Sequence, residues 1–161
     1  MKKKFVSMLL AAMMAGTMVA AVPVMAEEST EATTEATANA DLADKKVGVC
    51  IYQFSDNFMT LFRTELENYL VGLGFSKDNI TIVDGVNDQA TQSGQIDSFI
   101  ADEVDEQIIN PDNSSSASTI TDKVVAAGIP LVYINREPDA DEEARWEENG
   151  WNVTYVGCDA R

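Results

Sequence analysis

The sequence predicts an α/β fold with a parallel, doubly wound sheet. Short apolar runs of strand type alternate with longer segments in which apolar residues recur at helical spacing. Strands that alternate with helices in this way form a parallel sheet through right-handed crossovers, and the helices cover both faces. The chain of 161 residues is long enough for one such domain, which we expect to span residues 45–161.

The expected elements follow in the order β-α-β-α-β-α-β-loop-β. Gly72 and Gly74 close the first helix, Asn87 or Asp88 caps the second, and Gly128 ends the third. The expected strands are 47–52, 80–83, 107–109, 131–134 and 153–156. The first and third helices are expected at 58–73 and 114–127, and the second has its core face at Ile96, Phe99 and Ile100. The acidic segment 139–150 is expected to be a loop.

The first 26 residues are predicted to be a secretory signal peptide. Three lysines precede an apolar stretch, and Val24-Met25-Ala26 supplies small residues where a signal peptidase requires them. The stretch is also long enough to span a bilayer, so an uncleaved anchor is the alternative. Residues 27–44 are rich in Glu, Thr and Ala and are expected to be a disordered acidic linker. The protein is therefore expected to be exported, at the periplasmic or extracellular face of the membrane, and not to span it after cleavage.

Composition excludes several classes of function. The formal net charge of −16 argues against a nucleic-acid partner, because phosphate binding needs a basic surface. The chain has no histidine, which removes Ser-His-Asp and Cys-His catalysis and His-ligated metal sites. We expect no cofactor and no metal. Cys50 and Cys158 could form a disulfide in an exported protein, or remain two buried thiols without a redox role.

Polar side chains gather where the expected strands end. In open parallel sheets, ligands bind in the crevice outside the carboxyl ends of the strands. The strand ends carry the segments 52–58, 84–87, 110–113, 135–138 and 158–159. A binding site is therefore expected at this edge of the sheet.

Asp56 and Phe58 suit a sugar ligand. A carboxylate accepts hydrogen bonds from hydroxyl groups, and an aromatic ring offers a flat apolar face to the C–H bonds of a sugar ring. The alternative is that Asp56 only caps the following helix and that Phe58 belongs to the core. A glycosidase pair of Asp56 and Glu137 is a further alternative, but their separation does not follow from the sequence. No glycine-rich phosphate loop is present, and we expect a binding protein rather than an enzyme.

Three motifs resemble the galactose/glucose (methyl-galactoside) periplasmic binding proteins of sugar ABC transporters. They occur in the family's order, and the resemblance runs from about Lys46 to Arg161. The motifs are Ile51-Tyr52-Gln53-Phe54-Ser55-Asp56-Asn57-Phe58-Met59, Asn87-Asp88-Gln89 with Gln92 and Gln95-Ile96-Asp97, and Asn135-Arg136-Glu137-Pro138, to which Tyr155-Val156-Gly157 and Asp159 add a further match.

The resemblance implies the first lobe of a type I periplasmic binding protein. Asp56 would then accept hydrogen bonds from sugar hydroxyls, Phe58 would stack on a sugar face, and Asn135 would bond a ring hydroxyl. Tyr52 and Arg136 would lie near the rim or in support. Asn110 is expected to hold the turn after the third strand without touching sugar, because the next residues depart from the family's Leu-Val-Asp-Pro.

The resemblance also implies partners and a missing half of the site. A monosaccharide would be passed to an ABC transporter permease, or, alternatively, presented to a chemoreceptor or histidine kinase. The second lobe and the family's calcium site have no counterpart before Arg161. We expect a truncated gene or partial sequence, with a natural one-lobe protein as the alternative, and an affinity no better than millimolar for this polypeptide alone.

Overall fold

The computed structural model describes residues 40–157. The predicted signal peptide, residues 27–39 of the predicted linker and Cys158 lie outside these residues, so the disulfide alternative stays a prediction. None of the helices between residues 40 and 157 combines the length and the apolar character that a membrane crossing requires.

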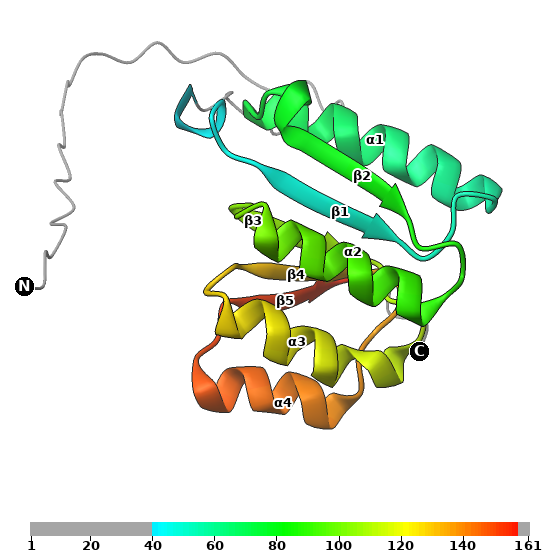
Figure 1. Ribbon diagram of the computed structural model, residues 1–161, viewed down its shortest axis with the longest axis vertical. Coiled ribbons are helices and arrows are strands. Elements are labelled where there is room, and N and C mark those ends of the chain that lie inside the picture. Colours follow the sequence, from blue (N-terminus) through cyan, green and yellow to red (C-terminus); the bar gives the residue numbers. More distant parts are fainter. Residues whose placement is uncertain (1–39, 158–161) are drawn as a thin grey trace, which may run out of the picture. The chain divides into compact units, whose positions relative to one another are not determined.

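The described residues form a parallel five-stranded sheet with the strand order β2-β1-β3-β4-β5 (Figure 1). Every pair of neighbouring strands is parallel. The strands are β1 (Val47–Ile51), β2 (Ile80–Asp84), β3 (Glu106–Ile109), β4 (Leu131–Ile134) and β5 (Val153–Val156). The helices are α1 (Asn57–Leu73), α2 (Gln89–Ala101), α3 (Ala117–Ala126) and α4 (Ala140–Asn149). The predicted parallel α/β fold is confirmed.

Two apolar cores lie on the two faces of the sheet. On one face, Met59 and Leu70 of α1 pack with Val49 and other residues of β1. Helices α2, α3 and α4 lie on the other face (Figure 1). Their side chains pack there with Cys50 of β1, Ile109 of β3 and Tyr133 of β4. Successive residues of a strand point to opposite faces, which is why Val49 and Cys50 belong to different cores. The sheet is therefore doubly wound.

Local sequence explains where the helices begin and end. Asp56 caps α1, and Gly74 ends it in the left-handed conformation at φ 117°. Of the two candidate caps for α2, Asp88 performs the role, because its side chain accepts from the Thr91 N–H. The third predicted helix starts as a short 3₁₀ turn at Ser114–Ser116 before α3 begins.

The predicted loop at 139–150 is wrong, because these residues form α4. Acidic residues in its first turn complement the positive end of a helix, and Gly150 closes it at φ 61°. The helix is anchored by Trp146, whose ring stacks on Tyr133 at a centroid distance of 5.5 Å. The helical period was missed because this single large apolar residue supplies most of the buried face.

Ordered structure also begins before the expected boundary at Lys45. A short 3₁₀ helix covers Ala40–Leu42, and Leu42 packs against the core on the α1 face. The Asn79 side chain donates to the Ala43 carbonyl oxygen at 2.8 Å. The end of the predicted linker is therefore part of the domain.

Candidate functional site

Tyr52, Asp56 and Arg136 meet at the carboxyl edge of the sheet. The Tyr52 hydroxyl donates to Asp56 Oδ2 at 2.6 Å. The Arg136 guanidinium, which follows β4, lies over the Tyr52 ring with its Cζ 4.2 Å from the ring centroid. The fold thus brings together side chains that are 84 positions apart between Tyr52 and Arg136 in the printed sequence.

The Asp56 carboxylate divides its two oxygens between different tasks. Oδ1 accepts from the backbone N–H groups of Phe58 at 2.7 Å and Met59 at 3.2 Å, which caps α1. Oδ2 faces Tyr52. The hydrogen bond from Tyr52 and the backbone bonds lower the pKa of the Asp56 carboxyl below its ordinary value, so the group is ionised at neutral pH. A carboxylate has about four acceptor positions. Three are in use, which leaves one acceptor position on Oδ2.

Asp56 is therefore a helix cap, as one alternative held. Capping does not exclude a contact with a ligand, because it occupies Oδ1 alone. The role of Asp56 in binding sugar stays a prediction.

Phe58 is not a core residue. Its side chain is 61% exposed, although it stands one turn before Phe62, whose ring centroid lies 6.1 Å away. An exposed phenyl ring at the start of a helix, beside an ionised carboxylate, provides the flat apolar face that the sugar hypothesis requires.

Asn135 follows β4 in a left-handed backbone conformation, with φ 64°. Asparagine tolerates this conformation better than most residues. Its backbone N–H donates to the Val156 carbonyl oxygen at 3.3 Å, and its own carbonyl oxygen accepts from the Tyr155 hydroxyl at 3.2 Å. These bonds hold the backbone beside Arg136, and the Asn135 side chain is exposed.

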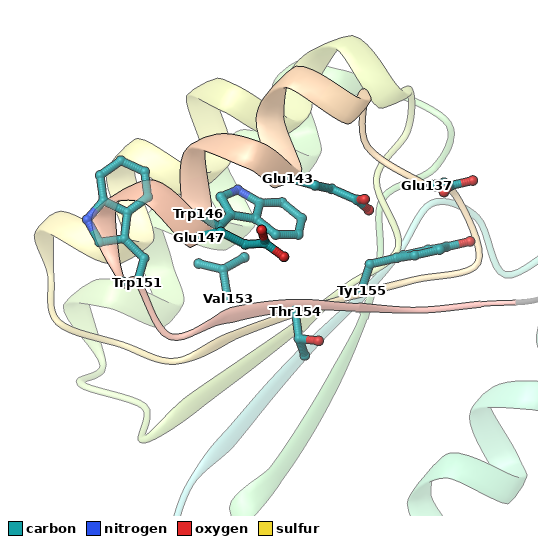
Figure 2. Close-up of a pocket in the computed structure, with 9 residues that line it drawn as sticks. Glu137, Glu143, Trp146, Glu147, Trp151, Val153, Thr154 and Tyr155 are labelled. Carbon is teal, nitrogen blue, oxygen red and sulfur yellow. The ribbon is translucent and has the colours of Figure 1, made fainter.

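Glu137 belongs to a different part of the surface from Asp56. It borders a hollow of about 370 Å³ between α4 and β5, where Trp146, Trp151 and Tyr155 also lie (Figure 2). Asp56 is not among the residues that line this hollow. Nothing in this arrangement pairs the two carboxylates as a glycosidase would need.

Sequence reasoning missed the role of Gln92, which it quoted only as part of a motif. Gln92 is 1% exposed and shares the buried face of α2 with Ile96 and Phe99. Its amide bonds the backbone on either side of Pro111, at Asn110 and Asp112. A polar residue at a core position of a helix was the available signal.

Asn110 lies at the turn after β3, where it was expected. Its backbone N–H donates to the Cys50 carbonyl oxygen at 2.8 Å, and its Nδ2 lies 3.1 Å from Met59 Sδ. Cys50 itself is fully buried, and burial raises the pKa of its thiol to about 12. It is therefore a core residue and not a nucleophile.

The parallel five-stranded sheet makes the chain an open α/β protein, a class in which ligands generally bind outside the carboxyl ends of the strands. The family model of the periplasmic binding protein domain matches residues 47–160. The chain belongs to this family.

Relatives with known names agree with that assignment. The D-galactose/methyl-galactoside binding periplasmic protein of Haemophilus influenzae is 33% identical over 119 residues, which cover 74% of this chain and 34% of the relative. A putative rhizopine-binding protein of Rhizobium meliloti is 39% identical over 92 residues, which cover 57% of this chain and 29% of the relative. The chain thus spans about a third of the length of the curated relatives it matches.

Solved structures show the same relationship. The crystal structure of an ABC transporter solute binding protein from Bacillus halodurans, with bound myo-inositol, is 32% identical and superimposes with a TM-score of 0.53. The match covers 65% of this chain and 36% of that one. The chain is therefore homologous to part of the solute-binding proteins of ABC transporters.

Proposed function

We propose that this protein binds a monosaccharide of the galactose or glucose type at the carboxyl edge of its sheet, for delivery to an ABC importer. The observation that carries the proposal is the pairing of the Asp56 carboxylate with the exposed ring of Phe58. The binding is reversible and involves no covalent step.

The chemistry of the two groups complements a sugar ring. The remaining acceptor position of Asp56 would take one hydroxyl donor, and a hydrogen bond to a charged group contributes about 1.5–3 kcal/mol. Phe58 would cover one face of the ring. Asn135 and Arg136, on the chain after β4, would add further polar contacts.

The relatives support a polyhydroxylated ring as the ligand. The Haemophilus influenzae relative is described as binding D-galactose and methyl-galactoside, and the Bacillus halodurans structure holds myo-inositol. Both ligand types are six-membered rings that carry several hydroxyls. Galactose or glucose is the choice that the motif around Asp56 favours.

A nuclear magnetic resonance titration of the full chain tests the proposal. D-Galactose, D-glucose, myo-inositol and acyclic mannitol would be added separately while the backbone amides of Tyr52, Phe58 and Asn135 are followed. We expect shifts with galactose or glucose and none with mannitol. A response to myo-inositol alone would contradict the assignment to monosaccharides, and no response to any ring would reject sugar binding at this edge.

Two exposed aromatic residues of α1 provide a matched pair of variants. Phe58 and Tyr69 are both 61% exposed, but only Phe58 lies beside Asp56. Phe58→Leu should weaken the sugar response strongly, and Tyr69→Leu should leave it unchanged. Equal effects of the two substitutions would show that Phe58 has no special part in binding.

A further inference from the structure

A buried side-chain amide holds the turn that follows β3. Gln92 Nε2 donates to the Asn110 carbonyl oxygen at 2.9 Å, and Gln92 Oε1 accepts from the Asp112 N–H at 2.9 Å. The backbone has left the sheet at this point, so these polar groups need other partners. One amide supplies both and thereby holds the chain on each side of Pro111.

Pro111 connects this turn to the candidate sugar site. Its carbonyl oxygen accepts from Arg136 Nη1 at 3.2 Å. The same guanidinium lies over the Tyr52 ring, and the Tyr52 hydroxyl donates to Asp56. Directional contacts therefore continue without a gap from the buried amide of α2 to the carboxylate that caps α1.

We propose that Gln92 is a positioning residue for ligand binding. By holding the turn at 110–112 it sets the place of Arg136 and Tyr52, and through them the orientation of the Asp56 oxygen that remains open to a ligand. This inference rests on the proposed function of that carboxylate. Gln92 itself is in the interior and does not touch the ligand.

The physical reason for such support is preorganisation. A ligand that meets a carboxylate already held in one orientation loses less free energy to ordering than one that must immobilise it. Arg136 is a long side chain with many rotamers, and it is only half-buried. A rigid acceptor at Pro111 selects the rotamer that places the guanidinium on Tyr52.

A purely structural role of Gln92 makes a different prediction. Loss of its amide would leave the Asn110 carbonyl and the Asp112 N–H without that partner and would lower stability. The positioning role requires an additional change at Asp56, which Gln92 does not contact. Measuring Asp56 directly therefore separates the two roles.

The test compares Gln92→Met with Gln107→Met in the full chain. Gln107 is also a buried glutamine, at 0% exposed, but it lies near the amino end of β3, and its amide has no hydrogen-bond partner among the described residues. The pKa of the Asp56 carboxyl would be followed by magnetic resonance through the Phe58 amide, together with D-galactose or D-glucose titrations.

In Gln92→Met we expect the pKa of Asp56 to rise toward its ordinary value, because the hydrogen bond from Tyr52 is less well held. The sugar titration should shift to about tenfold higher concentrations, the loss of roughly one hydrogen bond. Gln107→Met should change neither quantity. Gln92→Leu is the second variant, since it removes both the donor to the Asn110 carbonyl and the acceptor for the Asp112 N–H without adding a charge, and it should move the pKa of Asp56 in the same direction.

An unchanged Asp56 pKa in whichever Gln92 variant is folded would overturn the inference. So would equal responses in the Gln92 and Gln107 variants. If Asp56 responds to Gln92 while the unmodified chain shows no sugar response, the positioning of Asp56 is supported and the sugar assignment alone fails.

Discussion

Asp56 is a residue whose two carboxylate oxygens have separable consequences. Oδ1 stabilises the start of α1, whereas Oδ2 bonds Tyr52 and keeps one acceptor position open. Replacing the whole side chain would therefore mix a stability effect with a binding effect. An amide of the same size keeps a capping oxygen and removes the charge.

We expect Asp56→Asn to preserve stability and to weaken sugar binding by about tenfold or more, because asparagine caps helices as well as aspartate but accepts a weaker hydrogen bond. Asp56→Ala should lose binding and also about 1 kcal/mol of stability. Urea unfolding and the sugar titration together check both variants. Retained binding with a large loss of stability in Asp56→Ala would leave Asp56 as a helix cap alone.

At the level of single elements, β1 owes its close approach to α2 to a glycine. A Cβ atom at Gly48 would lie 2.6–2.9 Å from ring atoms of Phe99. That spacing is too short for any real contact, so the ring or the strand would have to move. Gly94 is on the exposed side of α2, and a Cβ atom added there would have no neighbouring atom within 4 Å.

Alanine at these two glycines should have opposite effects on stability. Gly48→Ala should lower the free energy of unfolding by about 1–3 kcal/mol through overpacking. Gly94→Ala should raise it by roughly 0.5–1 kcal/mol, because alanine favours a helix interior. Urea unfolding measures both, and a Gly48→Ala variant as stable as the parent chain would show that Phe99 yields easily.

Helix α4 is held by a buried carboxylate that sequence patterns did not reveal. Glu142 accepts from Trp146 Nε1 at 2.7 Å and from Arg145 at 2.9 and 3.0 Å. Burial by itself raises the pKa of Glu142, but the hydrogen bonds from Arg145 and Trp146 outweigh it and leave the pKa below the ordinary value of 4.5. The ionised form is thus the one that stabilises the folded state.

Because the pKa of Glu142 is lower in the folded state than in the unfolded state, we expect the protein to lose stability in acid. The contribution of Glu142 is fully present above its unfolded pKa and disappears as the pH falls through the lower pKa of the folded state. Glu142→Gln should cost about 1–3 kcal/mol at neutral pH and should flatten the fall in melting temperature below pH 5. Glu147→Gln, on the exposed side of α4, is the control. Parallel melting curves for the parent chain and Glu142→Gln across this range would contradict the assignment.

At the scale of the whole molecule, the proposed sugar contacts lie together on one exposed part of the surface of the described residues. Phe58 is largely exposed, and Asp56 lies at the edge of the sheet. These two residues would therefore contact one face of a bound sugar ring and leave its other face uncovered. The relatives are about three times as long as the matched region. We therefore expect the strength of binding by this chain to differ from that of a site closed on both sides.

A micromolar site is worth about −8 kcal/mol, and half of its contacts leave about −4 kcal/mol, which corresponds to millimolar binding. We accordingly expect galactose or glucose to bind this chain no more tightly than millimolar. Isothermal calorimetry measures this directly. Micromolar binding would mean that the surface around Asp56 and Phe58 is sufficient without a second wall.

Much of the fold followed from local pattern. The five strands and the first three helices were predictable because apolar periodicity indicates which residues are buried. The edge that carries Tyr52, Asp56 and Asn135 was predictable because parallel strands end on the same side of the sheet. Helix α4 was not predictable in this way, since its packing depends on a single stacked tryptophan and on a buried carboxylate bonded to the half-buried Arg145.

The sequence by itself therefore determined the parallel α/β class, and it supplied the expected ligand-binding edge and the candidate pair Asp56 and Phe58. Only the tertiary structure decided that Asp56 both caps α1 and bonds Tyr52, that Phe58 is exposed, and that the contacts of Gln92 reach the site through Pro111 and Arg136. The contacts of Asp56 are local, and they depend on how the turn after β1 folds. The contacts that link Gln92 to Tyr52 through Pro111 and Arg136 join residues far apart in the chain. They depend on strand register and crossover geometry, which no local pattern encodes.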